Sequence, residues 1–399
     1  MVCNNIWNIV HCTGGDLKMA IEDTLLTALT IIFGTIGLLA FGIFFGLIFK
    51  GIDRKLSAHM QGRIGPPIRQ PFRDIVKLFA KENIVPDNAI PWVFHWAPIV
   101  GLVATISILL YLPVGGFDPI AAGSGDLILV LYLLMIPSLA MVIGGFASGS
   151  PYSTVGAQRE MATMIAYEFP LAIIIVTFAW RISDNIHAIN SQIIDSSYTL
   201  EAVENNAFSL STISKVPVLI TEGTPAIAST SMWGVVGILG FIGLIILLLA
   251  LLIVTPAELS KIPFDSPEAE TEIAGGLLAE YSGRNLGMFY LTDAVKTLAM
   301  GSIIVALFFP WNLADLLSIQ EPVWLVYILN IVFFLLKVLL VILFSVTLIR
   351  VAIARLKIDQ IVGTYWLWIT LIALVGLVFI TWDSLFFAYD WYDTIASMI

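Results

Sequence analysis

Residues 233–254 read WGVVGILGFIGLIILLLALLIV and contain no charged side chain. A helix of about 20 such residues is long enough to cross the hydrocarbon core of a bilayer. Seven further apolar runs have a similar length, at 24–50, 95–113, 127–147, 160–180, 289–310, 323–348 and 362–382. We therefore predict an all-α polytopic membrane protein, with residues 1–399 as a single membrane domain of about eight transmembrane helices.

The composition excludes a soluble globular protein. Hydrophobic residues make up 59% of the 399 residues and charged residues only 12%, about half the charged share of an ordinary soluble domain. The net charge is −10, and a nucleic-acid partner is not expected. The bilayer is the environment that this composition requires.

The Lys and Arg residues are unevenly divided between the two sides of the predicted membrane. One side holds only Lys18, Arg181 and Lys215, whereas the loops on the other side carry most of the cations. The positive-inside rule places the basic loops in the cytoplasm and both termini outside a cell membrane. The cytoplasmic set is Lys50, Arg54, Lys55, Arg63, Arg69, Arg73, Lys77, Lys81, Arg159, Lys261, Arg284, Arg350, Arg355 and Lys357.

Three stretches lie between the predicted spans. In the cytoplasmic loop 51–94, apolar residues from Ile68 to Phe79 recur at helical spacing beside a basic row from Arg69 to Lys81. This pattern predicts an amphipathic helix along the membrane surface. The external loop, 181–232, is rich in Ser and Thr and suggests no function.

The third stretch, the cytoplasmic loop 255–288, is strongly acidic and begins TPAELSKIPFDSPEAETEIAGGLLAEYSG at residue 255. Ser266 and Pro267 are typical of a helix start. A helix from that point puts Glu268 and Glu272 on one face, where like charges repel and favour protonation. A cluster of this kind suits a proton or cation relay, and the alternative is a solvated acidic loop.

Four ionisable residues lie inside predicted spans and away from the span ends, where an unpaired charge costs at least about 2.5–3.5 kcal/mol. Glu168 precedes a proline in the fourth span, and Lys337 lies near the middle of the seventh. Asp293 and Lys296 are one turn apart in the sixth, a spacing suited to an ion pair. These residues predict an ion path, with internal pairing in a helix bundle as the alternative.

The cysteines exclude an iron–sulfur cluster or zinc site held by this chain alone. Its two cysteines, Cys3 and Cys12, are both near the N-terminus, whereas a cluster needs about four ligands. We predict no cofactor, no metal and no catalytic residue in this chain, so any redox centre belongs to a partner.

Several motifs together resemble the family of the H subunit of respiratory complex I, which includes the equivalent membrane component of energy-converting hydrogenases. They are QGRIGPP at 61–67, QPFRDIVKLFAKE at 70–82, AYEFP at 166–170, the acidic loop from Glu258 to Gly283, and RVAIARLKIDQ at 350–360. The resemblance covers nearly the whole chain.

The resemblance implies a helix bundle that anchors a peripheral redox arm and couples its electron transfer to proton or sodium translocation. The implied partners are peripheral iron–sulfur subunits, a nickel–iron or degenerate hydrogenase-like large subunit, and antiporter-like membrane subunits. With the residues inside the spans, the implied ion path comprises Glu168, Glu258, Asp265, Glu268, Glu270, Glu272, Glu280, Asp293, Lys296 and Lys337. The arm would dock on Arg63, Arg69, Arg73, Asp74, Lys77, Arg350, Arg355 and Asp359.

Two departures indicate a branch of this family. Quinone-reducing members typically have GPNR and a longer segment before QP, where this chain has only Pro67, Ile68 and Arg69 after GP. AELSKIPFD replaces their AETNRxPFD. Both features resemble membrane-bound hydrogenases and their sulfur-reducing relatives. The other functions that remain open are a quinone-binding subunit of a donor:quinone oxidoreductase and a free-standing ion transporter.

Overall fold

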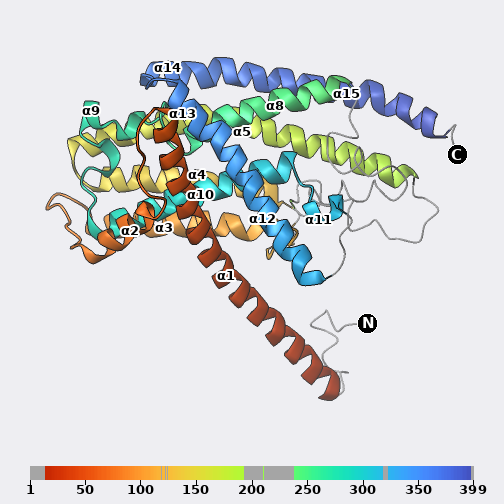
Figure 1. Ribbon diagram of the computed structural model, residues 1–399, viewed down its shortest axis with the longest axis horizontal. Helices are drawn as coiled ribbons and strands as arrows, with labels where there is room; N and C mark the ends of the chain where they lie inside the picture. Colours follow the sequence, from red (N-terminus) through yellow and green to blue (C-terminus); the bar gives the residue numbers. More distant parts are fainter. Residues whose placement is uncertain are drawn as a thin grey trace.

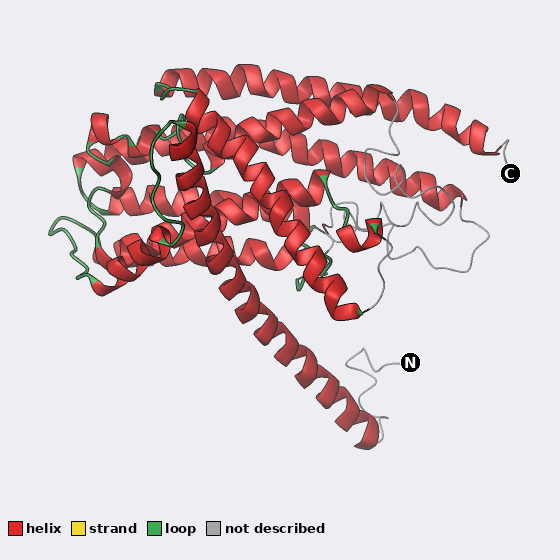
Figure 2. Ribbon diagram, in the orientation of Figure 1, coloured by secondary structure: helices red, strands yellow, loops and turns green. Residues whose placement is uncertain are grey.

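The computed structural model describes residues 14–117, 119–121, 123, 125–192, 210, 238–317 and 322–396, and these are almost entirely helical (Figures 1 and 2). Eight helical segments are long and apolar enough to cross a membrane, which confirms the predicted fold class. These candidate spans are Ile32–Met60, Pro91–Tyr111, Asp126–Ala147, Pro151–Arg181, Ile238–Glu258, Gly283–Phe308, Val323–Ala352 and Ile358–Leu385.

The long helices are α1 (Gly14–Met60), α3 (Pro91–Tyr111), α4 (Asp126–Ala147), α5 (Pro151–Gln192), α8 (Ile238–Glu258), α10 (Gly283–Phe308), α12 (Val323–Ile342) and α15 (Thr370–Ala396). Shorter helices are α2 (Gln70–Ala80), α9 (Glu270–Ile273), α11 (Leu313–Leu316), α13 (Leu348–Ala352) and α14 (Ile358–Gly363). Single π-helical turns connect α12 to α13 and α14 to α15, so each pair forms one span.

Helix α10 is the centre of the bundle. In its most apolar window 94% of residues are buried, against 22% for the first span. It packs against α1, α2, α3 and α12, and its residues from Ala294 to Phe308 are all buried. The one charged residue in this stretch, Lys296, therefore faces protein and not lipid.

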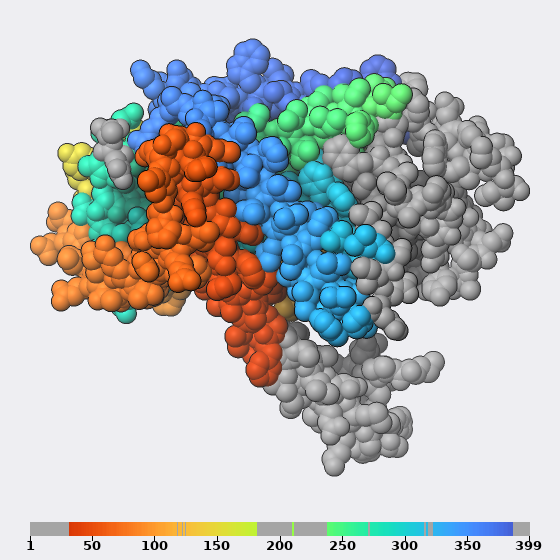
Figure 3. Space-filling view, in the orientation of Figure 1, coloured from red at the N-terminus to blue at the C-terminus, as the bar shows by residue number. Residues whose placement is uncertain are grey.

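Helices α2, α9 and α14 lie at one end of the bundle, which we call the loop end (Figure 1). Helix α11, the first turn of α1 and the last turn of α15 lie away from it, toward the opposite end. Helix α1 also extends away from the body of the molecule, as the space-filling view shows (Figure 3).

The predicted loop boundaries differ from the structure at 51–94 and at 255–288. The first span continues beyond residue 50 because its charges are paired: Asp53 accepts hydrogen bonds from Thr347 at 2.7 Å and Arg350 at 3.1 Å. Likewise α8 includes residues 255–258, and α10 begins at Gly283. The predicted amphipathic helix is α2. Most of the predicted external loop 181–232 lies outside the described residues.

Close packing of α1 on α10 depends on Gly46. A Cβ atom at this position would lie 2.6 Å from the carbonyl oxygen of Ala294, which is too close for any side chain. A Cβ at Gly37, on the same helix, meets nothing within 4 Å.

We predict that Gly46→Ala destabilises the protein, because α1 must move away from α10. Such overpacking costs about 1–3 kcal/mol. The thermal unfolding midpoint of the purified protein in detergent should fall for Gly46→Ala. It should stay the same or rise for the control Gly37→Ala, which only improves helix propensity. Equal midpoints for the two variants would contradict this account of the contact.

Candidate functional site

A buried ion pair lies where α8 meets α10. The Lys296 ammonium is 2.7 Å from Oε1 of Glu258, and the two side chains are only 4% and 1% exposed. Lys296 also donates to the Ser138 hydroxyl at 2.9 Å, which is 3.3 Å from the Tyr167 hydroxyl. One polar network thus joins α4, α5, α8 and α10 inside the apolar core.

Two further glutamates of α5 lie near this pair. Glu160 is 2% exposed and accepts a hydrogen bond from Ser260 at 3.4 Å. Glu168 has one buried carboxylate oxygen without a hydrogen-bond partner. The charges of Glu258 and Lys296 act on both glutamates. Three carboxylates therefore share a single buried cation, Lys296, which is an arrangement in which their charges are interdependent.

A second charge cluster lies closer to the loop end, around Asp293. Lys50 of α1 and Lys261 of the acidic loop contact its carboxylate at 2.6 and 2.7 Å. The predicted ion pair between Asp293 and Lys296 is therefore wrong. These residues are one turn apart, but each finds a partner on another helix or loop, and tertiary packing decides the pairing.

Glu268 connects the two clusters electrostatically. It is half-buried, and its charge acts on Glu160 while Lys261 and Asp293 act on it. Burial raises the pKa of Glu268 above its ordinary value, and Lys261 opposes part of that increase. Burial thus favours the protonated form of Glu268.

The predicted helix from Ser266 does not form as one element. Residues 266–268 make a single 3-10 turn, and Ala269 is extended before α9 begins at Glu270. Glu268 and Glu272 therefore do not share a helix face. The Ser153 hydroxyl of α5 donates to the Gly276 carbonyl at 3.1 Å, which holds this loop against α5.

The remaining acids of the loop are exposed to solvent or form ion pairs with arginines of other segments. Glu272 is exposed and pairs with Arg159 at 2.6 Å, and Asp265 pairs with Arg355 at the same distance. Glu280 is partly exposed and has no ion pair within the described part of the chain. The side chain of Glu270 lies outside the described residues.

Lys337 lies apart from both clusters. Its ammonium donates to the carbonyls of Phe309 and Trp311, each at 2.7 Å, just beyond the last turn of α10. A cation at this position satisfies free carbonyls and complements the helix dipole. Its geometry therefore supports a structural role at the end of α10 and gives no support to a place in the ion path.

The predicted docking residues occupy the loop end. Arg63, Arg69, Arg73 and Lys77 are exposed, as are Arg355 and Asp359 on and before α14. Asp74 pairs with Arg54 at 3.2 Å, and Arg350 pairs with Asp53.

The opposite charges of α2 and the acidic loop also predict that the two segments converge and that Arg63, Arg69 or Arg73 pairs with the acids. The segment that follows α2 does touch the end of the acidic loop, since the Ile84 amide donates to the Ser282 hydroxyl at 2.9 Å. The pairing is wrong, however: within the described residues the acids pair with Arg159, Arg355 and Lys296.

Glu160 is the main residue that the sequence reasoning missed. The available signal was an acid at the first position of the predicted span 160–180, two turns before Glu168. The sequence also does not identify Lys50 and Lys261 as partners of Asp293, because both fit the pattern of cytoplasmic charges. No cluster of three or more His, Cys, Asp or Glu able to hold a metal occurs among the described residues. Both cysteines lie outside them.

Comparison with known proteins gives consistent relatives. The family model described as NADH dehydrogenase matches residues 33–381. The H subunit of NADH-quinone oxidoreductase from Syntrophotalea carbinolica is 28% identical over 86% of this chain and 93% of its own length. Hydrogenase-4 component C of Escherichia coli is 30% identical over 68% of this chain and 73% of its own.

A solved structure agrees with these relatives. A chain in the membrane-bound sulfane sulfur reductase, an archaeal respiratory membrane complex, superposes with a TM-score of 0.67 at 26% identity. The match covers 87% of this chain and 98% of that one. The resemblance expected from the sequence motifs is confirmed.

We predict that Lys296→Met destabilises the protein strongly, because Glu258 would remain buried without its counter-charge. Breaking a buried pair in this way costs about 3–5 kcal/mol. The double variant Glu258→Gln with Lys296→Met removes both charges and should recover most of the loss in thermal midpoint. If the single variant is as stable as the double variant, an unpaired Glu258 is not the cause of any destabilisation.

Proposed function

Because this chain belongs to the NADH dehydrogenase family, we propose that it is the membrane-anchoring and energy-coupling subunit of an ion-translocating oxidoreductase complex. The relatives named above support this proposal, since each is named as an oxidoreductase subunit or component or belongs to a respiratory membrane complex. Redox chemistry in a docked peripheral arm, with iron–sulfur clusters in partner subunits, would drive a proton or sodium ion through the bundle.

The observation that carries the proposal is the buried Glu258–Lys296 pair with two more carboxylates around it. Charged groups in a membrane interior are costly and are usually part of an ion or proton path. Protonation of one carboxylate in such a coupled set changes the field at the others, because the set shares one cation. Through this coupling the carboxylates can take up, release and transfer charge, and this does not require a metal in the chain.

The acidic loop supplies the connection to the docked arm. Glu268 lies between the two charge clusters, and its loop is tied to α5 through Arg159 and to the residues before α14 through Arg355. The exposed basic residues Arg63, Arg69 and Arg73, on α2 and the loop before it, lie at the same end of the bundle. We assign the loop end to the cytoplasm by its excess of Lys and Arg, with both termini outside the cell membrane.

Within the family, we place the chain with the membrane-bound hydrogenases and sulfur-reducing relatives. The short segment between Gly65 and Gln70 supports this placement, as do hydrogenase-4 component C and the sulfane sulfur reductase. The second candidate is a quinone-binding subunit, which the longer match to an NADH-quinone oxidoreductase favours. Quinone-dependent activity of the purified assembly would select that second candidate.

We predict that Glu168→Gln abolishes ion translocation while acceptor reduction continues. Glutamine keeps the shape and hydrogen-bonding capacity of a protonated glutamate but cannot ionise. Glu168 suits this test because it has no ion-pair partner among the described residues, so no counter-charge is left unpaired. Membrane vesicles carrying the assembled complex should reduce the acceptor without building a gradient.

Glu82→Gln is the matched control, because Glu82 is an exposed carboxylate outside both clusters. It should leave both the gradient and acceptor reduction at the wild-type level. A wild-type gradient with Glu168→Gln would show that Glu168 is a packing residue and would remove it from the ion path.

A further inference from the structure

A basic cavity lies between α1, α2 and α10, and it shares Lys50 with the charge cluster around Asp293. It has a volume of about 250 Å³ and is open to the surface. Four cationic side chains line it, Lys50, Arg54, Lys77 and Lys81, with a single carboxylate, that of Asp74. The cavity therefore carries an excess of positive charge that the ion path does not explain.

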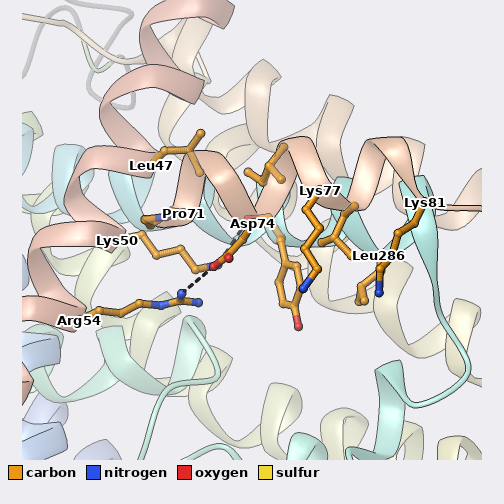
Figure 4. Close-up of a pocket in the computed structure, with 11 residues that line it drawn as sticks. Leu47, Lys50, Arg54, Pro71, Asp74, Lys77, Lys81 and Leu286 are labelled. Atoms are coloured by element: carbon orange, nitrogen blue, oxygen red, sulfur yellow. Dashed lines mark hydrogen bonds and ion pairs between the residues drawn. The ribbon is translucent and has the colours of Figure 1, made fainter. Parts of the chain in front are cut away.

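The cations of this cavity differ in whether they already have an ion-pair partner. Arg54 is held by Asp74, as the dashed line in Figure 4 shows, and Lys50 by Asp293. Lys77 and Lys81 are exposed and have no ion pair with any described residue. Figure 4 shows them one turn apart at the end of α2, with their side chains pointing to the same side of the helix. Two free ammonium groups thus face one space, as a phosphate-binding site requires.

The cavity lies at the level expected for lipid headgroups. Its lining includes the apolar residues Leu47 and Leu286, and α2 exposes the apolar side chains of Val76 and Phe79. Trp92 and Trp96, both exposed on the first turns of α3 at the same end of the bundle, are the residue type that marks a membrane–water interface.

An apolar strip continues from the cavity along α1 and consists of Leu47, which lines the cavity, and Phe44. Phe44 lies one turn from Leu47 toward the bilayer interior, is 52% exposed, and packs against Phe72 of α2 with ring centroids 5.8 Å apart. An acyl chain leaving the cavity would meet this strip. A free inorganic anion would make no use of it.

We propose that this cavity binds the phosphate headgroup of an anionic phospholipid. Lys77 and Lys81 contact the phosphate, Arg54 borders it, and the acyl chains run along Phe44. The bound lipid fixes α2 against α1 and α10 at the membrane surface. The site shares Lys50 with the Asp293 cluster, but Lys77 and Lys81 lie outside the proposed ion path. The proposal therefore holds whether or not Glu168 carries an ion.

The test uses the purified full-length protein, in its complex, titrated in detergent with fluorescent phosphatidylglycerol. The double variant Lys77→Gln with Lys81→Gln should bind about thirtyfold more weakly, as expected for the loss of two basic side chains that attract anionic lipid. The control Lys55→Gln with Lys357→Gln removes two exposed charges outside the cavity and should bind within about twofold of wild type.

Competition experiments identify the occupant. Unlabelled phosphatidylglycerol should displace the probe, whereas phosphatidylcholine, inorganic phosphate and a short-chain quinone at the same concentration should not. Equal displacement by phosphatidylcholine or quinone would show that the cavity does not select negative charge, and equal displacement by inorganic phosphate would show a soluble-anion site. Any of these results, or unchanged affinity of the Lys77/Lys81 variant, overturns the proposal.

Discussion

The ion pair of Glu258 with Lys296 is the interaction on which the arrangement of the bundle depends. Two charges removed from water in this way are stable only when each compensates the other and hydrogen bonds satisfy what remains. Ser138 provides such a bond to Lys296. Because the partners come from α4, α8 and α10, these three helices must meet at one point for the charges to be tolerated.

This constraint explains why α10 is buried around its whole circumference from Ala294 to Phe308. It carries both Asp293 and Lys296, and lipid on either side would leave one of them unpaired. Lys50 and Lys261 reach Asp293 from α1 and from the acidic loop, so the loop is positioned by the same helix that holds the buried pair. A change in charge at Glu268 is therefore felt by groups on α1, α5 and α10.

The fold was largely predictable from the sequence because apolar runs of spanning length have few alternatives in a bilayer. The eight candidate spans and the amphipathic helix α2 followed from hydropathy and period alone. The ends of the spans were less predictable. The helices that contain Asp53 and Arg350 extend past the apolar runs because these two residues pair with each other.

The site was predictable in its residue types but not in its contacts. Glu168, Glu258 and Lys296 could be named from charge inside or beside apolar segments. The partner of Lys296 could not be named, because neighbours along a helix compete with residues that tertiary packing brings closer. Lys337 shows the opposite case: a cation inside a span whose partners are backbone carbonyls, which no charge pattern can reveal.

In the proposed ion path, the buried carboxylates change their charge during turnover. Redox-triggered infrared difference spectroscopy of the assembled complex measures this directly, because a protonated carboxylic acid has its own carbonyl band. We expect a band change in the wild type that is lost in Glu168→Gln. An identical difference spectrum in the variant would show that the carboxylate of Glu168 keeps one charge state throughout, and it would remove Glu168 from the ion path.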